Sequence, residues 1–304
     1  MASPCRNILS RHILTIRINN LGQLSTNIVS RTANNPTAGI IIIGDEILKA
    51  QVIDTNSNYI CSLLYGNGIK VKKISVISDE IDRIAEEIVH FSNKYTYVIT
   101  SGGIGPTHDD VTFEALAKAF GDKLHYHPKL VEVIKTFASS QDISSPAYKL
   151  ARIPETASLK YGVNQETGEK LVYPCVTLKN VYVFPGSPLF LKKSFGNVYK
   201  ELFITNHNFI SKQLYLSARE ELFADALTKV SKEFPNVTFG SYPTTNTSYY
   251  QARVTIESDS EENTDKALAR FVELAPPNAV IDFDSKRKDQ KSGGSETTNT
   301  DSSS

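Results

Sequence analysis

Between residues 38 and 121 the sequence alternates short apolar runs with amphipathic patterns, and this alternation limits the fold more than any other feature. The runs AGIIIIGD, IKVKKISVI and YTYVIT are rich in β-branched residues, as buried strands are. Between two of them, SDEIDRIAEEIVHFSNK has helical spacing, with Ser78 or Asp79 expected as its cap. Strands that alternate with helices predict an α/β domain with a mainly parallel sheet and helices on both faces.

Further segments extend this pattern towards residue 205. DTNSNYICSLLYGNG is expected to be a helix that Asp54 or Thr55 caps and that Gly66 and Gly68 end. VTFEALAKAFG is expected to be another helix, ended by its last glycine. LVYPCVTLKNVYVFPGSP supplies two more strands, and a helix is expected from Leu189 onward.

A second, smaller unit is predicted after residue 205. KQLYLSA and YYQARVTIES resemble strands, REELFADALTKVSKEF and NTDKALARFVELA resemble helices, and FGSYP is expected to be a turn. We therefore divide the chain into a leader (1–36), an α/β domain (37–205), a small α+β domain (206–283) and a polar, disordered tail (284–304).

The leader suggests a cellular address. The first 44 residues contain no acidic residue but carry Arg6, Arg11, Arg17 and Arg31 among many Ser, Thr and Asn. This composition is typical of a mitochondrial transit peptide. The alternative is a disordered leader without an address, in a cytoplasmic protein.

Composition excludes several partners. Lys plus Arg total 33 and Asp plus Glu total 33, and no basic stripe with interleaved aromatics occurs, so we expect no nucleic acid. No apolar run approaches the roughly 18–20 residues of a membrane span, so we expect no membrane partner. Cys5, Cys61 and Cys175 lie too far apart to suggest a metal site or a disulfide framework, which fits a reducing compartment.

Three loops should meet where a ligand binds. In an open parallel sheet, ligands lie beyond the carboxyl ends of the strands, and Gly44–Glu46, Ser101–Asp110 and Pro185–Pro188 follow predicted strands. The second loop, SGGIGPTHDD, holds three glycines that let backbone N–H groups approach an anion closely, and a helix amino end follows it. This loop therefore predicts a phosphate cradle.

Two aspartates in the same loop predict a cation. Asp109 and Asp110 would repel a phosphate unless a metal lay between them, and Mg²⁺ or a similar divalent ion is commonly held by one or two carboxylates plus phosphate oxygens. Asp54 should lie near the same edge of the sheet and could face the same phosphate. In the alternative reading, either loop aspartate is a plain helix cap and the glycines only serve a tight turn.

Four separated motifs then resemble a known family. TAGIIIIGDEIL, DTN at 54–56, TSGGIGPTHDDVT at 100–112 and FPGSP at 184–188 resemble the molybdopterin-binding (MoCF, MogA/MoaB-like) domain, closest to its branch in animal FAD synthases and bacterial CinA proteins. The resemblance covers about residues 38–283.

The resemblance implies roles for individual residues. Asp54 and Asp110 match the catalytic acids, while Asp109 is the extra acid of the THDD variant. Asp109 and Asp110 are the expected metal ligands because, as stated above, their carboxylates would otherwise repel the phosphate. Leu189 stands where these branches usually have an acid after PG-x-P. We expect the substrate to be bound by residues of the three loops and the adjoining helix ends, namely Gly44, Asp45, Glu46, Asn56, Ser101, Gly102, Gly103, Gly105, Thr107, Thr112, Pro185, Gly186 and Pro188.

The activity that the resemblance and the acids together imply is metal-dependent hydrolysis of a dinucleotide pyrophosphate, with FAD giving FMN and AMP. Two alternatives stay open: adenylyl transfer to molybdopterin, and a non-catalytic module that binds a flavin nucleotide or regulates a partner. The expected partners are a flavin or pterin nucleotide and further copies of the chain in a homo-oligomer. No adenylyltransferase domain is recognised, so synthesis of FAD from FMN and ATP is not expected.

Weaker signals come from histidines and tyrosines outside these motifs. His125 and His127 have metal-like spacing on one strand face, but two ligands make a weak site. His108 could contact a phosphate, act in acid–base catalysis or merely be solvated. Tyr249 and Tyr250 could stack on a flavin or adenine ring, or pack on their own sheet.

The leader yields a first prediction. A fusion of residues 1–40 to a fluorescent protein is expected to enter mitochondria, because the segment is acid-free and carries arginines. Imaging of the fusion beside a mitochondrial dye measures this. A diffuse cytosolic signal would contradict the address.

Overall fold

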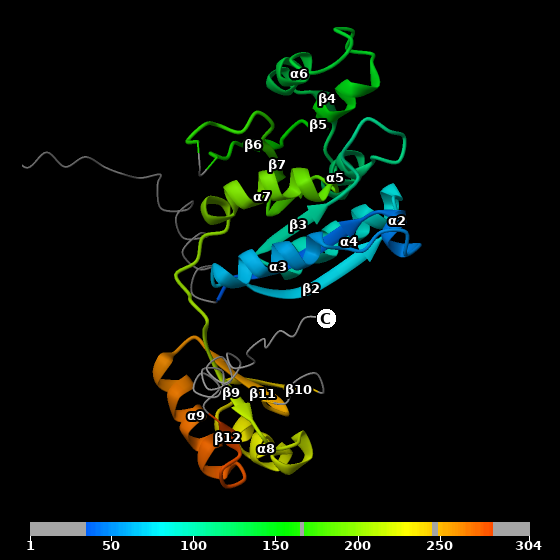
Figure 1. The fold of residues 1–304 in the computed structure, drawn as a ribbon. Coiled ribbons are helices and arrows are strands. Elements are labelled where there is room, and N and C mark those ends of the chain that lie inside the picture. The colour runs from blue at the N-terminus through cyan, green and yellow to red at the C-terminus, as the bar shows by residue number, and fades with distance from the viewer. Residues whose placement is uncertain (1–34, 165–166, 245–248, 282–304) are drawn as a thin grey trace, which may run out of the picture.

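The computed structural model describes residues 35–164, 167–244 and 249–281, which form two units with separate sheets (Figure 1). All of the expected tail and nearly all of the expected leader lie outside the described residues. Among the helices that are described, none combines the length and apolar character needed to span a membrane.

The first unit is built on a six-stranded sheet in which neighbouring strands follow the order β2-β1-β3-β8-β7-β6. Strands β2, β1, β3 and β8 run parallel, and β7 and β6 are antiparallel additions at one edge. The predicted, mainly parallel sheet is confirmed. In sheet order the strands are β2 (Lys70–Ile77), β1 (Thr37–Ile43), β3 (Tyr97–Ser101), β8 (Val181–Phe184), β7 (Cys175–Leu178) and β6 (Ser158–Lys160).

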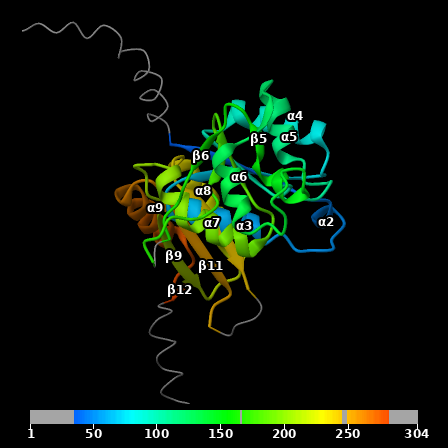
Figure 2. The same ribbon diagram turned by 90° about the horizontal axis from the view of Figure 1, so that it is seen from above.

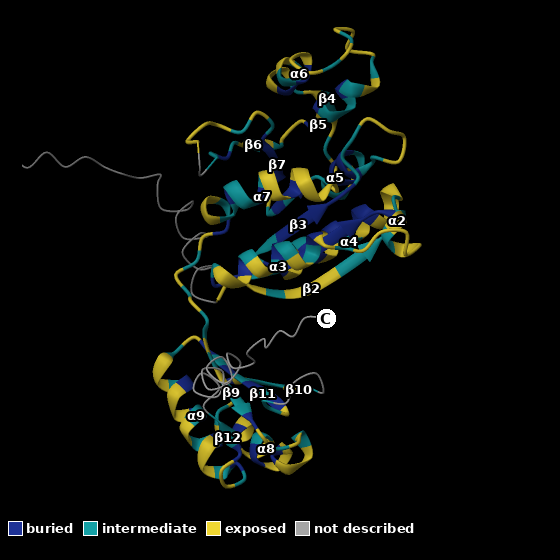
Figure 3. Ribbon diagram, in the orientation of Figure 1, coloured by how far each residue is buried: buried dark blue, intermediate teal, exposed yellow. Residues whose placement is uncertain are grey.

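Helices cover both faces of this sheet, as predicted. Helices α3 (Asn56–Gly66) and α7 (Pro188–Leu202) lie side by side on one face, and α4 (Ile81–Lys94) and α5 (Thr112–Phe120) pack on the other (Figure 1, Figure 2). The isoleucines of β1 alternate between the two cores, so the strand is buried on both sides (Figure 3). Its continuous apolar sequence follows from this double cover.

Shorter elements complete the first unit at places where no pattern was assigned. Helix α6 and a 3₁₀ helix, η1, pack beside a two-stranded antiparallel ladder of β4 and β5. A short helix, α2, follows β1 directly. These elements are α2 (Asp45–Leu48), β4 (Leu124–Tyr126), α6 (Pro128–Lys135), η1 (Pro146–Ala151) and β5 (Arg152–Pro154).

One predicted helix cap is present and another is wrong. Asp54 Oδ1 accepts hydrogen bonds from the backbone N–H groups of Asn56 and Ser57, each at 2.9 Å, as a cap does. Helix α4 begins instead after Glu80, whose side chain caps nothing. The side chain of Asp79 is used elsewhere, because its Oδ2 accepts a hydrogen bond from the backbone N–H of Asp45.

The second unit is a four-stranded antiparallel sheet with two helices on one face, which confirms the small α+β domain (Figure 1). The predicted turn FGSYP is wrong, because these residues form most of β10, which pairs with β11 over its whole length. Glycine and proline are tolerated there because β10 is an edge strand. The elements are β9 (Ile210–Leu216), η2 (Glu220–Leu222), α8 (Ala224–Glu233), β10 (Thr238–Pro243), β11 (Ala252–Ser258), α9 (Glu261–Leu274) and β12 (Val280–Ile281).

Tyr65 connects the two units. It lies in α3, its hydroxyl donates a hydrogen bond to the carboxylate of Glu257 in β11, and its ring stacks on Phe209 at 5.1 Å. Burial raises the pKa of Tyr65 to about 12, and the Glu257 carboxylate adds to the effect. The phenol therefore stays protonated, and the donor is kept, at neutral pH.

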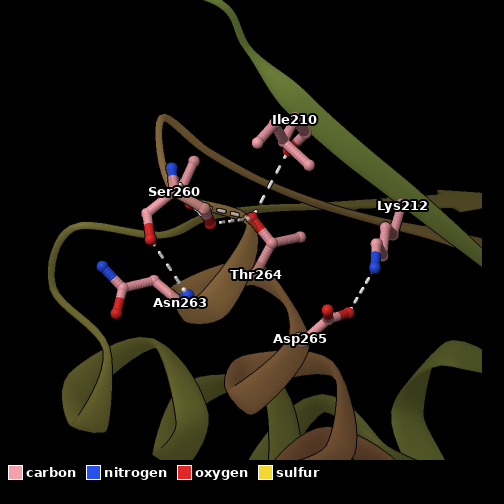
Figure 4. Close-up of polar contacts among 7 residues, drawn as sticks. Ile210, Lys212, Ser260, Asn263, Thr264 and Asp265 are labelled. Carbon is pink, nitrogen blue, oxygen red and sulfur yellow. Dashed lines mark hydrogen bonds and ion pairs between the residues drawn. The ribbon is translucent and has the colours of Figure 1, made fainter.

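The amino end of α9 is fixed to the sheet by polar contacts (Figure 4). Ser260 Oγ accepts a hydrogen bond from the backbone N–H of Asn263 at 3.3 Å. The buried Thr264 hydroxyl lies 3.0 Å from the Ser260 carbonyl oxygen and 2.8 Å from Ser258 Oγ, and it reaches the carbonyl of Ile210 in β9 at 3.5 Å. One hydroxyl thus links the helix start to two strands.

We expect Thr264→Val to lower the free energy of unfolding by about 1–3 kcal/mol, because valine keeps the shape but leaves buried polar partners unsatisfied. Chemical unfolding followed by circular dichroism measures the change. Thr228→Val, at an exposed position of α8, is the matched control and should change little. Equal stability of the two variants would contradict the role of this hydroxyl.

Candidate functional site

The three predicted loops do meet at one edge of the sheet. They follow β1, β3 and β8, which are parallel neighbours and so end on the same side. The loops are packed backbone against backbone: a Cβ atom on Gly186 would lie 3.1 Å from Gly102 Cα, and Gly102 N donates to the Phe184 carbonyl at 3.2 Å.

Glycine is required at two positions of the second loop. Gly102 has φ +118°, and a Cβ atom there would lie 1.9 Å from the carbonyl oxygen of Ile43. Gly103 has φ +61°, and a Cβ atom there would lie 2.3 Å from Thr112 Oγ1. Thr112 in turn donates its hydroxyl to the Gly102 carbonyl at 2.9 Å. Side chains at these glycines would force the loop away from β1 and α5.

Buried side chains lock the loops together. Asn56 Nδ2 donates to Ser101 Oγ at 3.1 Å and to the Gly186 carbonyl at 2.7 Å. Ser101 Oγ donates to the Pro185 carbonyl at 3.0 Å. Asn56 and Ser101, both expected at the site, therefore join the amino end of α3 to the ends of β3 and β8.

These residues border a small hollow of about 260 Å³, which we call the polar hollow. The amino ends of α3 and α7 both face it, through Thr55 and Asn56 and through Ser187 and Pro188. Helix amino ends carry partial positive charge and favour anions. The full lining is Ile42, Ile43, Glu46, Ile47, Val52, Ile53, Asp54, Thr55, Asn56, Ser101, Gly186, Ser187 and Pro188.

Two carboxylates share the polar hollow, and they are not the pair expected. Asp54 and Glu46 line it, with Glu46 folded over Gly44 so closely that a Cβ atom there would lie 2.6 Å from Glu46 Oε1. Asp110 lies within its own loop and is not among the residues that line the hollow. Of the two expected catalytic acids, only Asp54 therefore lies at the polar hollow.

Asp109 and Asp110 converge on one hydroxyl group. Asp110 Oδ2 accepts a hydrogen bond from Thr107 N at 2.8 Å, and Thr107 Oγ1 is in hydrogen-bond contact with both carboxylates. A Cβ atom on Gly105 would lie 2.4 Å from Asp110 Oδ2, so glycine gives this carboxylate room. A hydroxyl has one proton, so it can donate to only one of the two carboxylates at a time.

Acidic side chains of three segments gather beside this loop. Asp45 N donates to Asp79 Oδ2 at 2.9 Å, and burial raises the pKa of Asp79, with the Glu46, Asp45 and Asp109 carboxylates adding to the rise. The Thr107 hydrogen bond lowers the pKa of Asp109, and the Lys49 ammonium lowers that of Asp45. Lys49 pairs with Asp45 at 2.7 Å, so part of the negative charge of this cluster is already balanced.

Sequence reasoning missed Lys149. Its Nζ donates to the Thr107 carbonyl at 2.6 Å, so it holds the acidic loop from η1. It lies 42 residues beyond Thr107, in a segment where no pattern predicted an element. The contact between Lys149 and Thr107 becomes apparent only in the folded structure, because no sequence pattern relates residues so far apart. Asp79 was expected only as a helix cap, although it supports α2.

The histidines and tyrosines that gave weaker signals do not line the polar hollow. His108 is exposed, with its Nδ1 3.8 Å from Asp109. The His125 and His127 rings lie edge to face 5.6 Å apart, and in the described ranges no group of three or more His, Cys, Asp or Glu side chains is placed to hold a metal. Tyr250 packs edge to face on Tyr215 of β9 at 4.9 Å, in the second unit.

Comparisons with known proteins agree with the motifs. Residues 39–203 match the family model described as "Probable molybdopterin binding domain", and residues 208–284 match the one described as "FAD synthase, middle domain". These matches confirm the resemblance that the four motifs indicated.

Individual relatives cover much of this chain. A Caenorhabditis elegans protein named "Probable FAD synthase" is 33% identical over 269 residues, which is 82% of this chain and 52% of the relative. A "CinA-like protein" of Thermotoga neapolitana is 34% identical over 199 residues, 64% of this chain and 47% of the relative. The chain thus spans about half the length of each of these two relatives. The crystal structure of a CinA protein of unknown function from Thermoplasma acidophilum is similar at 27% identity over 56% of this chain and 100% of that one, with a TM-score of 0.49.

The acidic cluster yields a pH prediction. The folded-state pKa of Asp79 is raised, so ionisation of Asp79 costs the folded state stability as pH rises through that pKa. Near pH 3, below the unfolded aspartate value of about 3.9, the carboxyl is protonated in both states. We therefore expect Asp79→Asn to raise the free energy of unfolding at pH 7, by less than about 1 kcal/mol, and to leave it unchanged near pH 3.

Chemical unfolding at both pH values measures this difference. Asparagine keeps an oxygen that can accept the Asp45 N–H, so the variant tests charge rather than the loss of that hydrogen bond. The same stability difference at pH 3 and pH 7 would show that ionisation is not responsible.

Proposed function

The chain belongs to the family of molybdopterin-binding domains, and from this premise we propose that it binds a flavin dinucleotide at the polar hollow and hydrolyses its pyrophosphate. The products would be FMN and AMP, and the reaction would need a divalent metal. The match of residues 208–284 to a FAD synthase domain supports a flavin nucleotide as the substrate.

The observation that carries this proposal is the convergence of two helix amino ends on one hollow. Helices α3 and α7, of 11 and 15 residues, both begin at its lining, with Thr55 and Asn56 at one start and Ser187 and Pro188 at the other. Gly186 lines the hollow without a side chain of its own, whereas Gly102, Gly103 and Gly105, expected as the phosphate cradle, are not among its lining residues. An anion of the size of a diphosphate suits this arrangement.

Asp54, one of the two carboxylates that line the polar hollow, could act as the base that activates water. Asp54 uses Oδ1 to cap α3, and in the described residues no hydrogen bond engages its Oδ2. That oxygen can accept a proton from a water molecule as the water attacks one phosphorus. The bond from that phosphorus to the bridging oxygen breaks, and the bridging oxygen leaves with the other phosphate.

Asp109 and Asp110 are the residues that would hold the metal. Their carboxylates share a single hydroxyl proton on Thr107, so a cation between them would relieve their repulsion. A divalent ion bound there would supply charge neutralisation for a pyrophosphate that reached from the polar hollow to this loop. Lys149 keeps the loop that carries both acids in place.

A second candidate function, binding without turnover, is favoured by one observation. Both proposed acids already serve the backbone, since Asp54 caps α3 and Asp110 accepts the Thr107 N–H. Leu189, where the related branches usually have an acid, is an exposed apolar side chain that offers no replacement. A module that binds a flavin nucleotide would need the hollow but none of these acids.

Purified protein incubated with FAD and Mg²⁺ or Mn²⁺ distinguishes the two functions. Release of FMN and AMP, followed by chromatography, supports hydrolysis. Tight binding of FAD without release of either product supports the module. A parallel incubation with FMN, ATP and Mg²⁺ tests the reverse direction, and steady formation of FAD would show that the direction is misassigned.

The test of catalysis is Asp110→Asn, which keeps an acceptor for the Thr107 N–H but loses the charge. We expect turnover to fall by a factor of ~10² or more with little change in melting temperature. Asp142→Asn is the matched control, because Asp142 accepts hydrogen bonds from the N–H and hydroxyl of Ser144 in a similar exposed turn. An Asp110→Asn variant with full turnover would contradict the catalytic role.

A further inference from the structure

A second, larger hollow lies on the other side of the loop after β8. Its volume is about 550 Å³, and Pro185 lines it, whereas the next residue, Gly186, lines the polar hollow. We call it the apolar pocket. Its lining is Ile104, Gly105, Pro106, Phe137, Leu150, Leu171, Val172, Tyr173, Pro174, Cys175, Val183, Phe184, Pro185, Phe190, Lys193 and Ser194.

The apolar pocket has the size and chemistry of a small-molecule site. Such sites measure about 300–1,000 Å³ and are lined mainly by apolar and aromatic side chains with a few polar groups. The apolar pocket lies within that range and the polar hollow, at about 260 Å³, lies below it. In the proposed function the polar hollow binds the phosphates of a nucleotide. A large ring of the same nucleotide would need the volume of the apolar pocket.

Part of the wall of the apolar pocket is held in place by contacts within the protein. The Tyr173 hydroxyl donates to the Leu150 carbonyl at 2.8 Å, which joins the segment before β7 to η1. Val183 and Phe184, at the floor, are buried strand residues of β8. Pocket walls held in this way lose little freedom when a rigid ring enters.

Aromatic side chains at its rim are exposed in the absence of a ligand. Phe190 is 60% exposed and Phe137 is 58% exposed, although both line the pocket. Lys193, one turn after Phe190 on α7, adds a positive charge to the same rim. A planar ring with an electron-rich carbonyl edge would cover the aromatic surface and place that edge beside the ammonium group.

We propose that the apolar pocket binds the isoalloxazine ring of the flavin. This assignment rests on the proposed function, in which the pyrophosphate of the same molecule lies in the polar hollow. The ring is a planar, fused heteroaromatic system with two carbonyl groups at one end. The two spaces are lined by consecutive residues, Pro185 and Gly186, of the turn after β8.

Adjacent residues on α7 provide the test. Phe190 and Leu189 are both 60% exposed, but only Phe190 lines the pocket, so Leu189→Ala is the matched control for Phe190→Ala. The probes are riboflavin, which carries the ring without phosphate, and ADP, which carries a diphosphate without a flavin. Quenching of flavin fluorescence and calorimetry measure their affinities, and melting temperatures check that both variants fold.

We expect Phe190→Ala to weaken riboflavin binding about tenfold and to leave ADP binding unchanged. Leu189→Ala should change neither affinity. Riboflavin that binds equally well to wild type and Phe190→Ala, or that does not bind wild type at all, overturns the proposal. A pterin that binds in place of riboflavin, with the same dependence on Phe190, also overturns it.

Hydrolysis of FAD by the same preparations separates this proposal from the proposed function. Riboflavin binding that depends on Phe190, in a protein that releases no FMN from FAD, supports the ring site and refutes hydrolysis. Release of FMN at the wild-type rate and with the wild-type KM by Phe190→Ala supports hydrolysis and refutes the ring site.

Discussion

The close approach of three backbone segments at the carboxyl edge of the sheet is the constraint on which the rest of this site depends. Gly102 lies against the end of β1, where a Cβ atom would clash, and Gly186 lies against Gly102, where a Cβ atom would fit only tightly. Because these backbones meet, Asn56 can reach two loops at once, and the amino ends of α3 and α7 come to face the same hollow. A larger residue at Gly102 would separate the loops and disperse these groups.

The alternation of strands and helices was enough to predict the α/β architecture. Strands β1 and β3 are buried on both faces, and their continuous apolar sequences are typical of such strands. The edge strand β10 was missed because its glycine and proline are typical of turns, and only pairing with β11 makes FGSYP extended. The segment from β4 to β5 has short elements whose order comes from contacts distant in the sequence, so no local period revealed them.

For the site, the sequence predicted which loops come together but not how their acids are divided. Parallel strands end on the same side, so the meeting of loops follows from topology alone. The direction of a carboxylate depends on nearby hydrogen-bond donors, which the sequence pattern does not show. The Thr107 N–H holds Asp110 in its own loop, and the first N–H groups of α3 hold Asp54 beside the polar hollow. Lys149 and the apolar pocket likewise depend on η1, which the sequence did not reveal.

The tether from η1 to the acidic loop has a thermodynamic consequence. Lys149 holds the Thr107 carbonyl, and its neighbour Leu150 lines the apolar pocket and accepts the Tyr173 hydroxyl. Whatever stiffens the pocket wall therefore also stiffens the loop that carries Asp109 and Asp110. A ring in the apolar pocket and a cation on Asp109 and Asp110 would therefore bind cooperatively, each lowering the entropy cost of the other.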